Sequence, residues 1–166
     1  MKKVLLSVLA LSALSSASAS ERIGAYLLGL QYERDVNATD SVRYGVGLPV
    51  ALGFGGGGVL ALSGDVSYLR HVAPASQVVQ PYFGGSLGLV GIFGTSEGTS
   101  AAGVVLFPNV LGGLNFNVSN SLSLFTEAGV GPRVIFAGAS DGTSSAGGTD
   151  VSLGFGVRVG LNYTVR

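Results

Sequence analysis

Two features of this sequence could in principle do chemistry: a serine between glycines and a single histidine. Gly84-x-Ser86-x-Gly88 matches the string of a nucleophile elbow. That chemistry requires the serine on a sharp strand-to-helix turn, with a histidine base and an oxyanion hole beside it. Here the string lies inside a strand-like pattern with no helix after it, and His71 falls in a turn-like region. We therefore expect no catalytic residues and no enzyme activity.

Metal, cofactor and nucleic-acid sites also lack the residues they need. The chain has no cysteine, so thiol catalysis and cysteine-ligated metals are excluded, and one histidine without clustered partners makes no metal site. No dinucleotide or phosphate-loop motif is present. Both lysines, Lys2 and Lys3, lie in the first three residues. The rest has seven arginines against nine acids, a net charge of −2, with no basic patch for nucleic acid.

The first nineteen residues have the layout of a secretory signal peptide. A short basic start precedes an apolar run from Val4 to Leu14, and Ala17-Ser18-Ala19 fits the small-x-small cleavage pattern. The apolar run is shorter than the roughly 20 residues of a membrane-spanning helix. We expect residues 1–19 to be removed on export and residues 20–166 to form one domain; a retained anchor helix is the alternative.

The rest of the chain alternates with a period of two. In 42–54 and in 151–165, every second residue is a large apolar one and the residues between are small or polar. Side chains of a strand point to opposite faces in turn, so this pattern predicts strands. Five further segments follow it less cleanly, with turn-forming clusters between them: 22–34, 59–70, 79–93, 103–117 and 121–137. The two longest of these clusters are 94–100 and 138–148.

The composition indicates which face points outward. The face opposite the apolar one is mostly Gly, Ser, Ala and Asn, and charged residues are only 11% of the chain, against about 25% in ordinary soluble domains. Such a face suits the lumen of a narrow barrel better than a water-exposed surface. Strands in lipid must also close into a barrel, because every backbone polar group there needs a partner. We expect an all-β, up-and-down antiparallel transmembrane β-barrel.

The few charges then belong to the barrel interior. By parity, five of them share the small-residue face: Arg43, Asp65, Glu127, Arg133 and Arg158. We expect them to pair with one another inside, with Arg133 or Arg158 as the partner of Glu127. Several aromatic residues fall near strand ends, where they could form interfacial girdles or reflect ordinary strand preference: Tyr32, Tyr44, Phe54, Tyr68, Phe93 and Phe136.

The chain resembles the small outer-membrane barrels of the outer membrane protein A and X kind. The resemblance rests on Pro81-Tyr82-Phe83-Gly84-Gly85-Ser86-Leu87-Gly88, on Gly112-Gly113-Leu114-Asn115-Phe116 before a tight turn and Leu122-Ser123-Leu124, and on the final alternating strand. One departure is the C-terminal Tyr163-Thr164-Val165-Arg166, where such proteins usually end in an aromatic residue. Seven strands are clear, while single-chain bacterial barrels have an even number. We expect eight, with the hidden strand in 79–118.

The resemblance implies a place in the outer membrane of a diderm bacterium, with lipid and the barrel-assembly machinery as partners. It does not imply an activity, because fold alone never does. Three roles remain open at this point. The first is a structural or surface-interaction role, since a barrel of about eight strands fills its interior with side chains. The second is a narrow passive, porin-like channel, and the third is a soluble secreted barrel with an apolar ligand inside. The sequence makes no prediction of oligomeric state.

Overall fold

The computed structural model describes residues 20–48, 59–74, 76–96, 99–141 and 143–165. These residues form eight strands in chain order: β1 Glu21–Tyr26, β2 Gly29–Asp35, β3 Asp40–Gly47, β4 Val59–His71, β5 Val79–Ser96, β6 Thr99–Asn117, β7 Leu122–Ser140 and β8 Ser145–Val165. The predicted signal peptide, residues 1–19, lies outside the described residues, as do residues 49–54 of the predicted strand 42–54. No helix long and apolar enough to span a membrane occurs in the part of the chain that is described.

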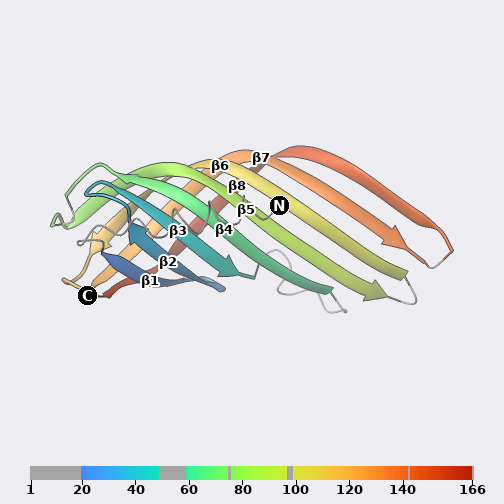
Figure 1. The fold of residues 1–166 in the computed structure, drawn as a ribbon, viewed down its shortest axis with the longest axis horizontal. Coiled ribbons are helices and arrows are strands. Elements are labelled where there is room, and N and C mark those ends of the chain that lie inside the picture. The colour runs from blue at the N-terminus through green and yellow to red at the C-terminus, as the bar shows by residue number, and fades with distance from the viewer. Residues whose placement is uncertain (1–19, 49–58, 75, 97–98, 142, 166) are drawn as a thin grey trace, which may run out of the picture.

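The strands close into one up-and-down barrel (Figure 1). Each strand pairs antiparallel with its neighbours in sequence, and β1 closes the ring by pairing with β8, from Glu21 opposite Val165 to Tyr26 opposite Gly160. The prediction of an eight-stranded antiparallel barrel is therefore confirmed.

The hidden eighth strand lies in 22–34, so its prediction in 79–118 was wrong. β1 and β2 are joined by a two-residue turn at Leu27 and Leu28, and Leu28 has a φ of 63°. A non-glycine residue at positive φ is uncommon, and two leucines carry no turn signal. The turn also reverses the alternation, so that Tyr26 faces the interior rather than sharing the outer face with Leu30.

The predicted loops at 94–100 and 138–148 are mostly strand. β5 runs to Ser96 and β6 starts at Thr99, while β7 runs to Ser140 and β8 starts at Ser145. The glycine- and serine-rich ends of these strands pair through their backbone groups, β5 with β6 and β7 with β8. The β7–β8 turn is short because Asp141 accepts hydrogen bonds from the backbone N–H of Ser144 (2.6 Å) and of Thr143 (2.9 Å). These donors hold the pKa of the Asp141 carboxyl below its usual value.

The barrel is apolar outside and polar inside, as the alternation predicted. Outward side chains along β8 are strongly exposed, among them Phe155 at 70% and Val157 at 79%. Among the described residues six apolar side chains are buried, against twelve polar or charged ones. Soluble domains usually bury apolar rather than polar side chains, so the burial here is inverted. A soluble barrel with an apolar ligand inside would need the apolar face to point inward, whereas here it points outward.

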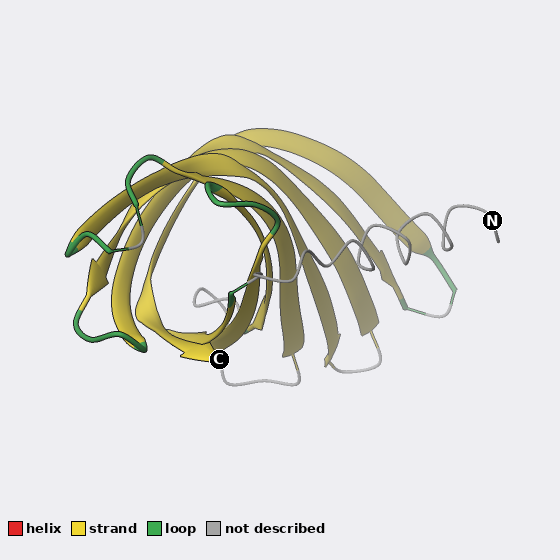
Figure 2. Cartoon of the chain, turned by 60° about the vertical axis from the view of Figure 1, so that its left-hand side comes forward, coloured by secondary structure: helices red, strands yellow, loops and turns green. Residues whose placement is uncertain are grey.

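The two ends of the barrel differ. The ring is complete at the end where β1 begins and β8 ends. The strands β1, β2 and β3 reach only a short way from this end, because they have six, seven and eight residues. β5 to β8 have 18 to 21 residues. These four strands therefore run past the ring (Figures 1 and 2). We call the complete end the ring and the part beyond it the extension.

Candidate functional site

An ion pair crosses the lumen at the centre of the ring. Arg43 on β3 lies 2.7 Å from the Glu127 carboxylate on β7, and the two side chains are 1% and 7% exposed. In a ring of eight strands β3 and β7 stand on opposite walls. Tyr82 on β5 donates to the same carboxylate at 3.1 Å, and Arg43 donates to Ser67 at 3.4 Å. The pair thus ties four strands together through the lumen.

A second ion pair crosses the lumen beside the first. Arg158 on β8 donates to Asp65 on β4 at 2.7 Å and 3.5 Å, again joining opposite walls. The guanidinium of Arg158 stacks 4.5 Å from the ring centre of Tyr26. Ser67 donates to Asp65 at 3.2 Å and connects the two pairs. Charged groups on both walls therefore fill the middle of the barrel.

Arg133 lies on the inner wall but forms no ion pair with the described residues. Its guanidinium lies 5.9 Å from the ring centre of Phe107. A Cβ added at Gly154 would come within 3.3 Å of its Nε, so the side chain lies between β6 and β8. The partner of Glu127 is Arg43, another of the five predicted interior charges, rather than Arg133 or Arg158. That partner depends on which side chains the closed ring places opposite each other, which local alternation does not reveal.

A third polar cluster lies nearer the chain ends and was not predicted. Arg22 contacts Glu33 and also donates to Asp35 at 2.7 Å. Ser41 donates to Glu33 at 2.8 Å, and His71 Nε2 lies 3.3 Å from the same carboxylate. His71 is thus a buried strand residue, and its prediction as a turn residue was wrong.

This cluster has the residue types of a metal site or a catalytic triad, but its geometry supports neither. Glu33, Asp35 and His71 bring ligand atoms within 4.8 Å of one another, yet the Arg22 guanidinium already lies against both carboxylates. Ser41 lies 3.2 Å from His71 Nε2, the nitrogen that also faces Glu33, whereas a triad needs its acid on the other nitrogen. His71 Nδ1 has no partner among the described residues.

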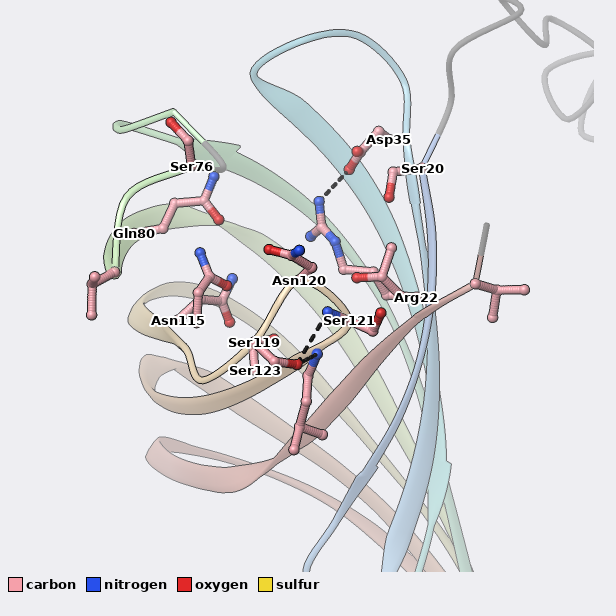
Figure 3. Close-up of a pocket in the computed structure, with 15 residues that line it drawn as sticks. Ser20, Arg22, Asp35, Ser76, Gln80, Asn115, Ser119, Asn120, Ser121 and Ser123 are labelled. Carbon is pink, nitrogen blue, oxygen red and sulfur yellow. Dashed lines mark hydrogen bonds and ion pairs between the residues drawn. The ribbon is translucent and has the colours of Figure 1, made fainter.

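A polar vestibule opens below this cluster at the end that holds both chain termini of the barrel (Figure 3). It encloses about 690 Å³, and its lining includes Arg22, Asp35, Gln80, Asn115 and Asn120. Deeper along the inner faces of β2 and β8, the buried Gln31 donates to the buried Asn162 at 2.7 Å. The vestibule therefore ends on buried, mutually bonded side chains rather than on an apolar floor.

The sequence motif around Ser86 has no catalytic surroundings in the structure. Ser86 lies within β5, in register with Ser67 on β4 and Asn109 on β6. It therefore occupies a regular strand position without the turn that an elbow nucleophile needs.

Three solved structures to which this chain is similar are of bacterial outer-membrane or surface proteins. The N-terminal β-barrel domain of Pseudomonas aeruginosa OprF matches at 12% identity over 89% of this chain and 95% of that one, with a TM-score of 0.51. Neisserial surface protein A matches at 17% identity over 87% and 92%, with a TM-score of 0.49. A major outer membrane protein from Thermus thermophilus matches at 16% identity over 89% and 100%, with a TM-score of 0.46. No family model and no curated protein sequence matches the chain.

The match to OprF shows that this chain shares the fold of that β-barrel domain, which confirms the fold that the sequence resemblance implied. Identities this low show the shared fold and nothing of a shared role.

Proposed function

We propose that this protein is an outer-membrane β-barrel with a structural or surface-interaction role, and that it neither catalyses a reaction nor conducts solutes. The observation that carries the proposal is the inverted burial, with apolar residues outside and paired charges inside. The exterior suits hydrocarbon, and in lipid a closed barrel leaves no strand edge unpaired along its ring.

Outward-facing tyrosines of the ring support the placement of this protein in a membrane. Tyr32 on β2 stands in register with Tyr44 on β3, and Tyr44, Tyr68 and Tyr163 are all about half exposed. Aromatic residues of this kind occupy the interfaces between lipid and water in outer-membrane barrels. Of the other candidate girdle residues, Phe54 lies outside the described residues.

The crossed ion pairs support a closed lumen over a channel. Arg43 and Glu127 leave almost no exposed surface at the middle of the ring, and the Asp65–Arg158 pair fills the neighbouring space. A barrel of eight strands has room only for its own side chains. The polar vestibule of Figure 3 is then a closed recess.

The test is the fate of residues 20–166 refolded with and without phospholipid vesicles or detergent micelles. We expect a β-rich species, by circular dichroism, with heat-dependent gel mobility only when lipid or detergent is present, and export to the outer membrane in cell fractionation. A monomer that folds in plain buffer would overturn the proposal, because its exterior would then have to be water-compatible.

A further inference from the structure

Beyond the crossed ion pairs, the described strands do not form a complete barrel wall. β8 pairs with β1 only through Gly160–Val165, whereas its pairing with β7 continues to Ser145. The extension is therefore a curved sheet whose concave side continues the lumen (Figure 2), and β8 has no partner strand on its second edge there among the described residues. Leu27 in the β1–β2 turn, where the pairing of β8 with β1 ends, is apolar and 71% exposed.

The concave side of the extension is apolar, unlike the interior of the ring. A hollow of about 500 Å³ lies there, and every lining residue is Ile, Val, Ala or Gly: Ile92, Gly94, Ala101, Ala102, Gly103, Val105, Ile135, Ala137, Gly138, Ala139, Ala146 and Gly147. We call it the trough. Its volume falls within the roughly 300–1,000 Å³ of ligand sites.

Both faces of the sheet are apolar at this level. The segments 101–106 and 134–139 contain no polar residue, so the period-two alternation that marks the ring is lost in β6 and β7. Strands with apolar residues on both sides are those buried on both sides. The outward side faces the lipid under the proposed function, and the concave side presents a second apolar surface.

A cation, Arg133, lies next to the trough; it is exposed and is not one of the residues that line the hollow. Arg133 follows Ile135 and Ala137 along the same face of β7, one step deeper in the lumen. Its guanidinium is held against Phe107 at 5.9 Å, and no acidic side chain of the described residues forms an ion pair with it. Asp150 lies on the same face of β8, in register with Ile135; like Arg133 it is exposed and outside the lining of the trough.

We propose that the trough binds one long-chain fatty acid, with the hydrocarbon chain against Val105, Ile135 and Ala137 and the carboxylate on Arg133. The uncharged lining fits the chain, since burial of each CH₂ group is favourable by about 0.8 kcal/mol. The planar guanidinium fits a carboxylate, which it can engage with two parallel hydrogen bonds. Ligand binding goes beyond the proposed structural role, which stands whether or not the trough is occupied.

The test is native mass spectrometry of the refolded barrel in discs of dioleoylphosphatidylcholine, titrated with oleic acid or with oleyl alcohol. Folding of each sample is first verified by heat-dependent gel mobility, so that a failure to bind is distinct from a failure of the barrel. We expect a one-to-one adduct with oleic acid. Arg133→Gln should weaken that adduct about tenfold or more while leaving the alcohol unaffected.

Ala137→Phe fills the trough and should abolish the adduct, and Ala101→Phe on the neighbouring strand β6 provides a second blocking variant. Ala128→Phe is the matched control, since Ala128 lies on the outward face of the same strand. The proposal is overturned if no adduct forms, if phosphatidylcholine is retained in place of oleic acid, or if Ala128→Phe and Ala137→Phe reduce binding equally. Equal effects of Arg133→Gln on acid and alcohol would also overturn it.

Discussion

The ring and the extension differ in the side chains on their inward face, which are charged in the ring and apolar in the extension. In the ring, both ion pairs join opposite walls, and Arg43, Glu127 and Asp65 are almost fully buried. In the extension, the same inward face carries Val105, Ile135 and Ala137, and no wall stands opposite them among the described strands. Buried charges need partners close by, and only a complete ring supplies a facing wall. In this molecule the inward ion pairs therefore occur where two walls of the barrel face each other, and the apolar inward face occurs where no described strand stands opposite.

The largest effect is expected from breaking the ring pair. Glu127→Ala leaves Arg43 buried without its carboxylate and Tyr82 without its acceptor. Removing one partner of a buried pair typically costs about 3–5 kcal/mol. We expect that loss in the free energy of unfolding, measured by urea titration of the barrel in vesicles.

Glu21→Ala is the control for this loss. Glu21 lies 3.9 Å from Arg34 at the barrel surface, where both side chains are partly exposed. Exposed pairs contribute about 0–1 kcal/mol. A Glu127→Ala barrel no less stable than the Glu21→Ala barrel would show that the lumen pair does not hold the ring.

The next largest effect is expected from arginine substitutions on the outward face of β8. It should be large at the level of the lipid and small near the β7–β8 turn. Phe155 and Thr149 share the outward face of β8, with Thr149 nearer the β7–β8 turn. Arginine on the lipid side costs about 2–4 kcal/mol at the bilayer midplane and about 0–1 kcal/mol near the interfaces. Phe155→Arg should therefore reduce the folded fraction in vesicles strongly, and Thr149→Arg only slightly. Equal losses of folded fraction in the two variants would mean that Phe155 and Thr149 do not lie at different depths relative to the bilayer.

A smaller effect is expected from steric crowding in the ring. A Cβ at Gly113 would lie 2.4 Å from the Tyr82 ring and 2.6 Å from the Thr126 carbonyl oxygen, whereas one at Gly112 would meet only the Tyr82 carbonyl oxygen at 3.8 Å. Gly113→Ala should cost about 1–3 kcal/mol, and Gly112→Ala should be nearly neutral. Urea unfolding of the two neighbouring variants measures the difference directly, and matched stabilities would refute the tight packing of Tyr82.

The smallest expected effect is local and concerns the second edge of β8 beyond its pairing with β1. Residues 160–165 of β8 lie between β1 and β7, while residues 145–159 pair with β7 alone in the described chain. We expect every second amide of 145–159 to exchange rapidly with deuterium, and most amides of 160–165 to be protected. Uniform protection along β8, by nuclear magnetic resonance, would show that another strand covers this edge.

Local alternation was sufficient to predict the faces of most strands. It placed Arg43, Asp65, Glu127, Arg133 and Arg158 on one face, and the structure places all five side chains toward the lumen. It could not give their partners, because Arg43 and Glu127 are 84 positions apart and meet only through the register of the closed ring.

The Arg22–Glu33 contact was missed for a different reason. As one continuous strand, 22–34 would put these two residues on opposite faces, with Arg22 toward lipid. The turn at Leu27 and Leu28 puts both inside. An arginine on the apolar face of an otherwise regular segment was the available signal for a hidden turn, since such a position is costly in lipid.

The extension was underpredicted because its strands lack alternation. Glycine, alanine, serine and threonine at 94–96, 99–101, 138–140 and 145–147 resemble loop composition, yet the backbone of these residues is paired with a neighbouring strand. Strand pairing is a property of the backbone, so side-chain pattern alone does not limit its length.

Conductance in a planar lipid bilayer tests the central claim most directly. If the two crossed ion pairs close the lumen, the natural chain should insert without discrete current steps, while the double variant Asp65→Ala with Glu127→Ala should show them. Steady open-channel steps from the natural chain would contradict the closed ring and would favour the narrow channel instead.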